Sequence, residues 1–536
     1  MKKNLKLIFL IFSSLQLTAQ SKSDAKLIVS IVVDQMRTDY LTRFANLYEG
    51  GFKTLMEEGQ VFWNAHYSHV PTYTAPGHAS IYTGTDPRFH GLIANDWYVI
   101  DSGKTSYCVE DKNAMPIGTA SNYAKRSPKN ILSTTWTDEL EWVSNRKSKI
   151  FAFSLKDRGA ICAAGHLGDA AFWLDKRGFV SSSYYMKELP KWLENFNKKN
   201  DIQSYMSGKW DYLIDKEYYP LPNTSEFERI PKGARNADFP YELDQLYNSD
   251  TTYTEAFKGT PQGNQILIDV AIEALKNEKL GIHNNPYPDV LAISFSSTDY
   301  LGHSTGIRSH EIIDMYLRLD RQLNTLFNYL NKKIGEDNFV IVLTADHGAA
   351  DNPSQARMDG MNTDWIAPAD LENECRKLIL NAGINNEDVL NFSNEQIYIQ
   401  INDSSNPMNA ENKRKIVRDA ILSHPAIMEA WTKEDIQRAS DPFSIMRKNG
   451  SNKLSGDVFF SLYPGSIIYS KTGTTHGSGY TYDTNVPIIF FGRKSLSSQN
   501  HIERVNVKDI APTLSYMFGL SLPSACNGHI LPLNYN

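Results

Sequence analysis

Five short apolar runs predict the strands of a central sheet. They lie at 26–34, 149–155, 289–296, 338–343 and 486–491. Such nearly continuous runs are typical of strands that are buried on both faces of a parallel sheet. Between them, apolar residues recur at helical spacing, over 39–58, 264–280, 310–334 and 507–518. Alternating buried strands and helices indicate an α/β three-layer sandwich with a mostly parallel central sheet.

Two long segments lack this alternation. Residues 165–260 are rich in Trp, Tyr and turn residues, and residues 352–465 hold amphipathic helices at 372–381 and 411–423 among polar loops. We interpret both segments as insertions over the active site. Together with these insertions, residues 20–536 are predicted to form one catalytic domain.

The N-terminus has the pattern of a secretory signal peptide. Lys2, Lys3 and Lys6 precede a mostly apolar stretch over 7–17, and the small residue Ala19 follows. This predicts cleavage after about residue 19 and a periplasmic or secreted protein. No later stretch is apolar over about 18 residues, so no stable membrane insertion is expected.

Charge and cysteine content narrow the functional classes further. The net charge is −6 and no basic stripe is visible, which argues against a nucleic-acid partner. The four cysteines are far apart and form no CxxC pair, so a zinc ribbon is not expected. In an exported protein they permit one or two disulfides, with three full pairings open: Cys108, Cys162, Cys375 and Cys526. We expect a monomer.

A turn over 71–84 carries a candidate nucleophile. Its sequence is PTYTAPGHASIYTG, and Pro76 suits the first turn of a helix, so Thr74 is predicted at or beside the N-cap. There the Thr74 oxygen would lie near unpaired backbone N–H groups and the positive end of the helix dipole. An alkoxide is less costly in that place than in water. Taken alone, the residue also fits an ordinary Thr N-cap.

Acidic residues follow three of the predicted strands, namely Asp34, Asp299 and Asp346. One such Asp is often only a helix cap, but two of the three have a histidine close by. Ligands bind at the carboxyl ends of parallel strands, so we infer that the three converge on one sheet edge.

Three histidines complete a predicted two-metal site. His303 lies one helical turn after Asp299, His347 directly follows Asp346, and His476 lies in a Thr-Thr-His-Gly turn. Three Asp and three His divide into two three-ligand zinc sites, each with an open position. The other histidines, among them His66, His69, His78 and His90, are interpreted as structural.

Asp34, the TxTxPGH turn, DxxxH, TADHG and TTHG, in this order and over nearly the whole chain, resemble the alkaline phosphatase superfamily. That superfamily includes phosphatases, nucleotide pyrophosphatase/phosphodiesterases, sulfatases and cofactor-independent phosphoglycerate mutases. The resemblance implies one zinc on Asp299, His303 and His476. It implies a second zinc on Asp34, Asp346 and His347, together with the Thr74 oxygen.

Asn95, Lys156 and Arg158 point to one branch of that superfamily. With the sequences FSLKDRG (153–159) and GLIANDWY (91–98) they resemble the PafA-type alkaline phosphatases, whose monoesterase site surrounds the phosphoryl oxygens with an Asn, a Lys and an Arg. A monoester dianion has one more unesterified oxygen than a diester, so two cations and an amide favour monoesters. The resemblance therefore implies an exported, zinc-dependent phosphate monoesterase with a phosphothreonine intermediate on Thr74.

Other functions are weighed against this one. A phosphodiesterase or nucleotide pyrophosphatase shares the metals and the nucleophile and stays the alternative. A sulfatase is disfavoured because Thr74 stands where that family has Cys or Ser, and a mutase is disfavoured by the signal peptide. An exported binding protein without activity would be expected to lack a ligand or the nucleophile, and none is missing. The natural substrate is not specified by the sequence.

Overall fold

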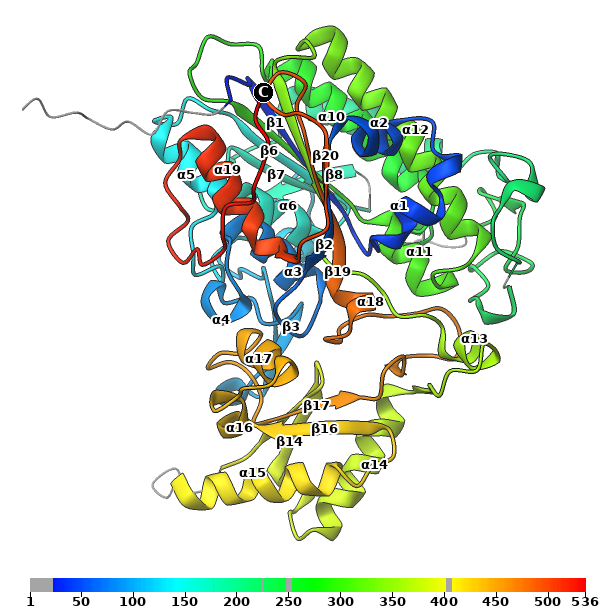
Figure 1. The fold of residues 1–536 in the computed structure, drawn as a ribbon, viewed down its shortest axis with the longest axis vertical. Coiled ribbons are helices and arrows are strands. Elements are labelled where there is room, and N and C mark those ends of the chain that lie inside the picture. Colours follow the sequence, from blue (N-terminus) through cyan, green and yellow to red (C-terminus); the bar gives the residue numbers. More distant parts are fainter. Residues whose placement is uncertain (1–22, 177, 224, 247–252, 402–406) are drawn as a thin grey trace, which may run out of the picture.

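All five predicted strands lie in one large mixed sheet, which has eleven strands in the described part of the chain (Figure 1). The computed structural model describes residues 23–536 except 177, 224, 247–252 and 402–406, so the predicted signal peptide lies outside the described residues. The strands are β1 (Leu27–Val33), β2 (Gln60–His66), β5 (Pro116–Ile117), β6 (Ile150–Ser154), β7 (Ala170–Asp175), β8 (Gly178–Ser182), β11 (Asp289–Phe295), β12 (Phe339–Thr344), β19 (Asn485–Phe491), β20 (Gln499–His501) and β21 (Val505–Asn506).

The centre of this sheet is parallel. Strands β12, β1, β11, β6 and β7 are neighbours in that order and all run in the same direction. Every residue of β1, β6, β11 and β12 is buried, as the continuous apolar runs predict. Strand β19 is antiparallel to both β12 and β2, which makes the sheet mixed.

Helices cover both faces of the sheet, which confirms the three-layer α/β fold (Figure 1). One layer contains α3 (Thr74–Thr83), α5 (Trp136–Val143), α6 (Asp157–Ala164) and α19 (Ile510–Phe518). The other contains α1 (Asp39–Arg43), α2 (Gly51–Glu58), α10 (Pro261–Glu278), α11 (Ser297–Thr305) and α12 (His310–Lys333). Shorter elements at the edges are α4 (Pro87–His90), β3 (Asp96–Val99), β4 (Lys104–Tyr107), α13 (Pro353–Met358) and α18 (Thr481–Thr484).

The first predicted insertion is partly wrong. Strands β7 and β8 lie within 165–260, yet they extend the central sheet beside β6. Their sequences lie among aromatic and turn residues, which hid the strand pattern. The rest of the segment forms α7 (Lys191–Lys199), α8 (Ile202–Tyr205), β9 (Lys209–Trp210), β10 (Tyr241–Glu242) and α9 (Tyr253–Lys258).

Aromatic side chains fix this segment to α12. The Trp210 Nε1–H donates to Asp314 Oδ1 at 2.7 Å, and the Tyr219 hydroxyl donates to the other oxygen of the same carboxylate at 2.7 Å. The Tyr241 hydroxyl donates to Glu311 at 2.7 Å. The many Trp and Tyr residues therefore serve packing as well as hydrogen bonding.

Residues 365–468, called the inserted lobe here, lie between β12 and β19 and form a small α/β unit. The predicted helices are present as α14 (Pro368–Asn381) and α15 (Pro407–Ile421). The sequence did not predict the four-stranded sheet that they pack against, with the order β14 (Val389–Ser393), β15 (Gln396–Ile399), β17 (Val458–Leu462) and β16 (Ile427–Thr432). The lobe also contains α16 (Lys433–Gln437), α17 (Pro442–Asn449) and the short pair β13 (Trp365–Ile366) and β18 (Ile467–Ile468).

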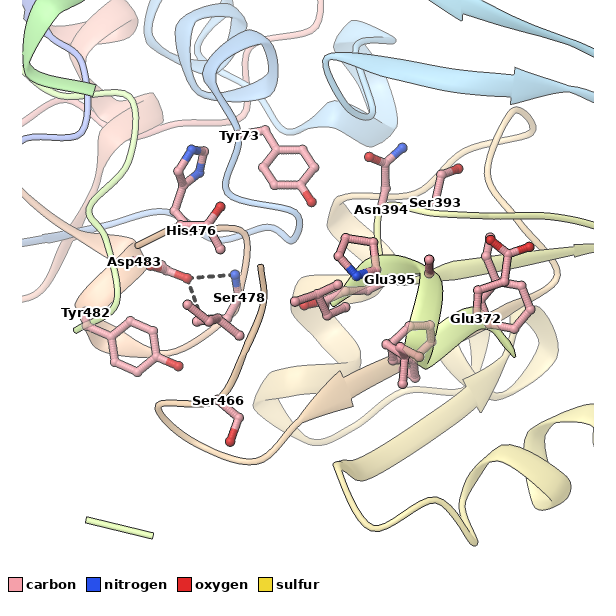
Figure 2. Close-up of a pocket in the computed structure, with 18 residues that line it drawn as sticks. Tyr73, Glu372, Ser393, Asn394, Glu395, Ser466, His476, Ser478, Tyr482 and Asp483 are labelled. Atoms are coloured by element: carbon pink, nitrogen blue, oxygen red, sulfur yellow. Dashed lines mark hydrogen bonds between the residues drawn. The ribbon is translucent and has the colours of Figure 1, made fainter. Parts of the chain in front are cut away.

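The lobe has its own hydrophobic core, which includes Leu371, Ile397, Val417 and Phe460. A cavity of about 420 Å³ lies between the lobe and the loops that carry Tyr73 and His476 (Figure 2).

The four cysteines are all free thiols, so none of the disulfides that the sequence permits is present. Among the described residues, none of the helices combines the length and the apolar character needed to cross a membrane.

Candidate active site

Thr74 is the first residue of α3, directly after the N-cap Tyr73, as predicted. Its side chain is buried, and the helix ends at Thr83, before Gly84 in the left-handed conformation with φ of 67°. Gly77 allows α3 to approach the loop after β12 closely, because a Cβ there would lie 2.2 Å from the Asp346 carbonyl oxygen. The candidate nucleophile thus stands at a helix N-terminus, against the edge of the sheet.

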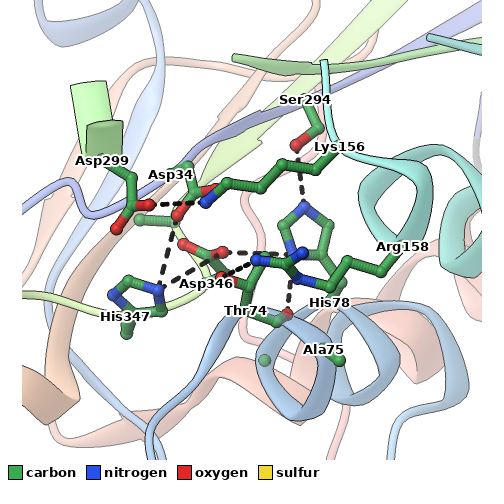
Figure 3. A network of polar contacts seen from close by, with 12 residues as sticks. Asp34, Thr74, Ala75, His78, Lys156, Arg158, Ser294, Asp299, Asp346 and His347 are labelled. Atoms are coloured by element: carbon green, nitrogen blue, oxygen red, sulfur yellow. Dashed lines mark hydrogen bonds and ion pairs between the residues drawn. The ribbon is translucent and has the colours of Figure 1, made fainter. Parts of the chain in front are cut away.

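The three predicted carboxylates meet at the carboxyl ends of adjacent parallel strands (Figure 3). Asp34 directly follows β1, Asp346 lies two residues after β12, and Asp299 is in the first turn of α11, just after β11. Lys156 joins two of them, since its Nζ donates to one oxygen of Asp34 and one of Asp299, both at 2.6 Å. All four side chains are buried.

The three predicted histidines turn the same ring nitrogen toward these carboxylates. His303 Nε2 lies 3.2 Å and His476 Nε2 lies 3.6 Å from Asp299 Oδ1, whereas His347 Nε2 lies 3.4 Å from Asp34 Oδ1. Each Nδ1 contacts a backbone carbonyl, at 2.8 Å, 2.7 Å and 2.9 Å respectively. A carbonyl only accepts, so each Nδ1 carries the proton and a neutral ring has its lone pair on Nε2. This is the tautomer that metal-binding histidines use.

The charges at the site shift several pKa values. Burial, reinforced by Asp299 and Asp346, raises the pKa of Asp34 well above its ordinary value. Burial opposes the charge of Lys156, but Asp299 and Asp34 outweigh it and raise the pKa of that ammonium. Burial lowers the pKa of His347 and, with repulsion from His347, that of His476. For His303, burial also acts downward, but the Asp299 carboxylate outweighs it and raises the pKa.

The donor set fits two metal ions that share one carboxylate. The donor atoms of Asp299, His303 and His476 lie within 4.8 Å of one another, and so do those of Asp34, Asp299 and His347. Asp34 Oδ1, Asp346 Oδ2 and His347 Nε2 are buried and accept or donate no hydrogen bond among the described residues. Such groups are costly unless a cation satisfies them. The structure thus contains buried Asp/His groups that are consistent with a binuclear metal site.

Asp346 differs in one detail from its predicted role. The group of donor atoms around Asp34 and His347 contains Asp299, where the sequence predicted Asp346. Its Oδ1 accepts from the Gln35 backbone N–H at 3.1 Å, and its Oδ2 lies 3.2 Å from His78 Nδ1 and 3.6 Å from His347 Nε2. Asp346 therefore adjoins both the second group and His78.

Two of the three residues that were predicted to bind the phosphoryl group contact the start of α3. The Arg158 guanidinium donates to Thr74 Oγ1 at 3.4 Å, and Asn95 Oδ1 accepts from the Ala75 backbone N–H at 2.9 Å. Lys156 is the N-cap of α6 and Arg158 lies in its first turn, so both leave the chain at a helix start after β6. Their side chains reach the same edge as the three carboxylates.

Three residues at the site were not predicted. Gln35 follows Asp34 at a φ of 64°, and its amide donates to Asp299 Oδ1 at 2.8 Å. His78, which was interpreted as structural, pairs with Asp346. The Tyr107 hydroxyl accepts from Arg158 at 3.1 Å and donates to Asp157 at 2.5 Å. Gln35 had a sequence signal in its place next to a strand-end Asp, and His78 had one in its place within the TxTxPGH turn.

Comparisons with known proteins agree with this geometry. The family model of type I phosphodiesterase / nucleotide pyrophosphatase matches residues 28–484. A Myroides odoratus protein named calcium-transporting ATPase is 37% identical over 535 residues, which cover 97% of this chain and 96% of that protein. Alkaline phosphatase PafA of Elizabethkingia meningoseptica is 37% identical over 522 residues, which cover 94% of this chain and 93% of PafA.

A comparison of folds gives the same result. The crystal structure of wild-type alkaline phosphatase PafA superimposes with a TM-score of 0.87 at 35% identity, covering 95% of this chain and 98% of that one. Together with the sheet-edge site, these matches identify the family. The chain belongs to the type I phosphodiesterase/nucleotide pyrophosphatase family and, within the alkaline phosphatase superfamily, is a PafA-type alkaline phosphatase.

Proposed function

We propose that this phosphate monoesterase is exported, uses two zinc ions and works through a phosphothreonine intermediate on Thr74. The observation that carries the proposal is that Arg158 and Asn95 contact the first two residues of α3, while Lys156 binds the carboxylates of the same sheet edge. Arg158 already contacts the Thr74 oxygen at 3.4 Å, and Lys156 lies in the carboxylate cluster next to it. Two cations and an amide in this place suit the three free oxygens of a monoester.

In the first step, the Thr74 oxygen attacks phosphorus in line as the bond to the leaving oxygen breaks. Thr74 loses its hydroxyl proton and the departing alcohol gains one, which leaves a phosphothreonine. Arg158 and Asn95 hold phosphoryl oxygens, and Lys156 adds positive charge directly or through water. In the second step, water cleaves the phosphothreonine, which releases phosphate and restores the Thr74 hydroxyl. Phosphoryl transfer needs little beyond such positioning and charge stabilisation.

Two groups of residues would hold the zinc ions. Asp299, His303 and His476 would form one site, and Asp34, His347 and Asp346 the other, with Asp299 near both. Zinc accepts this mixture of imidazole nitrogen and carboxylate oxygen, whereas magnesium prefers oxygen and water. Zinc bound there supplies positive charge that favours the alkoxide of Thr74 and offsets charge on the leaving oxygen.

The decisive experiment compares kcat/KM for p-nitrophenyl phosphate and bis-p-nitrophenyl phosphate with zinc-loaded protein. We expect a strong monoester preference that collapses in Lys156→Ala and Arg158→Ala. Lys129→Ala is the control, because it removes a half-exposed lysine that pairs with Asp111. A kcat/KM for the diester that is comparable to that for the monoester, and that neither site variant changes, would favour the phosphodiesterase alternative.

Metal removal tests the zinc assignment separately. Dialysis against a chelator should abolish turnover and lower the melting temperature, because the cation offsets repulsion among buried carboxylates. Added zinc should restore both, and magnesium or calcium should not. Recovery with magnesium alone would contradict the zinc assignment without affecting the monoester preference.

Export is proposed from the N-terminal pattern at 1–19, which lies outside the described residues. Fractionation of the expressing cells, followed by N-terminal sequencing of the mature protein, tests it. We expect an exported form that begins near residue 20. A cytoplasmic protein that retains Met1 would contradict the proposal.

A further inference from the structure

The cavity between the inserted lobe and the catalytic edge lies directly beside the candidate active site. Tyr73, which directly precedes Thr74, lines it together with His476, one of the candidate metal ligands. Figure 2 shows these two side chains on one side of the cavity, with Asn394, Glu395 and Glu372 of the lobe on the other. The cavity thus adjoins the site next to Thr74 and at His476, which makes it a candidate space for the alcohol part of a substrate whose phosphoryl group meets Thr74.

The size and walls of the cavity suit an organic group. Its volume of about 420 Å³ lies within the usual range for small-molecule pockets, roughly 300–1,000 Å³. Phe392, Phe460, Ile467 and Ile468 contribute apolar surface from the lobe, and the Tyr73 ring contributes it from the catalytic side. Burial of an alkyl or aryl group against such walls is favourable in proportion to the apolar area removed from water.

The charged side chains that line the cavity are acidic, whereas the charged side chain that contacts Thr74 is the Arg158 guanidinium. Glu372, Glu395 and Asp483 line it, whereas the described lining includes neither lysine nor arginine. Arg376 and Arg447 pair with Glu372 and Glu395 from behind, so part of the negative charge is balanced. An alcohol with a second anionic group would have to lose its hydration there without gaining a cationic partner.

We propose that this cavity binds the leaving-group alcohol of the substrate and selects phosphate monoesters whose alcohol is extended, apolar and free of further negative charge. This inference rests on the proposed monoesterase function of the same site. It assigns substrate choice to the inserted lobe and leaves phosphoryl transfer to the sheet edge.

Three alkyl monoesters with matched primary leaving oxygens test the idea: methyl phosphate, hexyl phosphate and the phosphate ester of 6-hydroxyhexanoate. We expect kcat/KM to rise about tenfold or more from methyl to hexyl, since each buried methylene contributes favourably. The carboxylate tail should lower it again by about tenfold relative to hexyl. In addition, 1-hexanol should inhibit competitively at concentrations at which methanol has no effect.

Matched variants locate the effect in the cavity. Phe392→Ala should reduce the hexyl-to-methyl ratio, whereas Leu390→Ala, two residues earlier on β14 and outside the cavity lining, should keep it. Glu372→Gln should relieve the penalty of the carboxylate tail. Glu374→Gln is its control, because that residue lies on the same helix α14 but pairs with His424 instead of lining the cavity.

Failure of this inference is distinguishable from failure of the proposed function. Equal kcat/KM for methyl and hexyl phosphate, with good turnover of p-nitrophenyl phosphate, would overturn the cavity assignment and leave the monoesterase intact. If no monoester is hydrolysed, saturation-transfer NMR with 1-hexanol tests the cavity alone. Contact of hexanol with the wild-type protein that Phe392→Ala loses supports the assignment, and an absence of contact overturns it.

Discussion

The two regions on either side of the cavity are built on different principles. The region called the catalytic wall here is the strand-end cluster that adjoins the cavity next to His476, a set of buried acidic and basic side chains in which Lys156 connects Asp34 and Asp299 at 2.6 Å at the ends of parallel strands. The lobe wall is a set of apolar side chains on a small sheet that has its own hydrophobic core. The first wall depends on exact placement of charges, whereas the second depends on shape and apolar area.

This difference separates the chemistry from substrate selection. Buried charges are stable only while every partner stays in place, so few changes at the sheet edge can be tolerated. Apolar walls accept substitutions of similar volume at modest cost. A lobe with a separate core can thus change its cavity surface while the strand-end groups stay fixed. Substitutions in each of the two regions can test this separation.

Thr74→Ala should have the largest effect, because it removes the oxygen that we propose receives the phosphoryl group. We expect kcat/KM for p-nitrophenyl phosphate to fall by about 10⁴-fold or more, as for other enzymes that lose their nucleophile. Rapid acid quench of the wild type with ³²P-labelled substrate should trap phosphothreonine, and the variant should give no label.

Thr72→Ala is the control for this variant, since it removes a nearby hydroxyl that donates to the Ser478 carbonyl. It should retain most of the turnover. Full activity of Thr74→Ala would refute the phosphothreonine intermediate. Another group would then have to be the nucleophile beside the metal-binding residues, Lys156 and Arg158.

The catalytic wall was far easier to predict from the sequence than the lobe wall. Asp34, Asp299 and Asp346 each follow a continuous apolar strand, and parallel topology alone brings such residues to one edge. Gln35 and Tyr107 escaped prediction because their roles depend on side-chain orientation, which no periodicity encodes. The lobe strands, such as β15 with four residues, are too short for a distinctive pattern. The strands β7 and β8 are as long as β12 and β6, and they were missed because they lie among aromatic and turn residues.

Acid should destabilise the catalytic domain through two buried histidines, His69 and His90. Burial, with Lys508 acting in the same direction, lowers the pKa of His69 to about 3, and burial with repulsion from His69 lowers that of His90 to about 3. Unfolded histidine titrates near 6.5, so below that pH the unfolded chain binds more protons. The free energy of unfolding should therefore fall between pH 6.5 and 3, by about 1.4 kcal/mol per pH unit for each histidine.

Urea unfolding at pH 7.5, 6 and 5 measures this slope. His90→Gln should make it shallower, because one of the two groups no longer titrates. Ser80→Ala removes a hydroxyl that contacts His90 at 3.2 Å but no titrating group, so it should lower stability while keeping the slope. An unchanged slope in His90→Gln would contradict the assignment.

Tyr107→Phe should weaken the proposed contact between Arg158 and the phosphoryl group while it leaves Thr74 in place. The Tyr107 hydroxyl accepts from Arg158 at 3.1 Å and donates to Asp157. Arg126 donates to the same Asp157 carboxylate at 2.6 Å. Without the hydroxyl the guanidinium is less fixed, and we expect about tenfold lower kcat/KM for the monoester. The diester should change less, so the monoester-to-diester ratio is the measurement.

Tyr184→Phe, which removes a hydroxyl that donates to the His166 carbonyl, is the matched control for this variant. A proportional loss on both substrates in Tyr107→Phe would indicate general damage to the fold, and would contradict a positioning role for Tyr107.

Ile421→Val should give the smallest effect on stability, and it tests most directly whether the lobe and the catalytic edge are independent. Ile421 is fully buried at the end of α15 within the core of the lobe, and it is absent from the cavity lining. Removal of one methylene group from such a site typically costs about 1 kcal/mol of stability. Chemical denaturation should show this loss, while kcat/KM for methyl phosphate stays at the wild-type value because the strand-end groups belong to another core. A parallel drop in turnover of methyl phosphate would mean that packing in the lobe also holds the catalytic edge in place, and the two walls would then have to be treated as one unit.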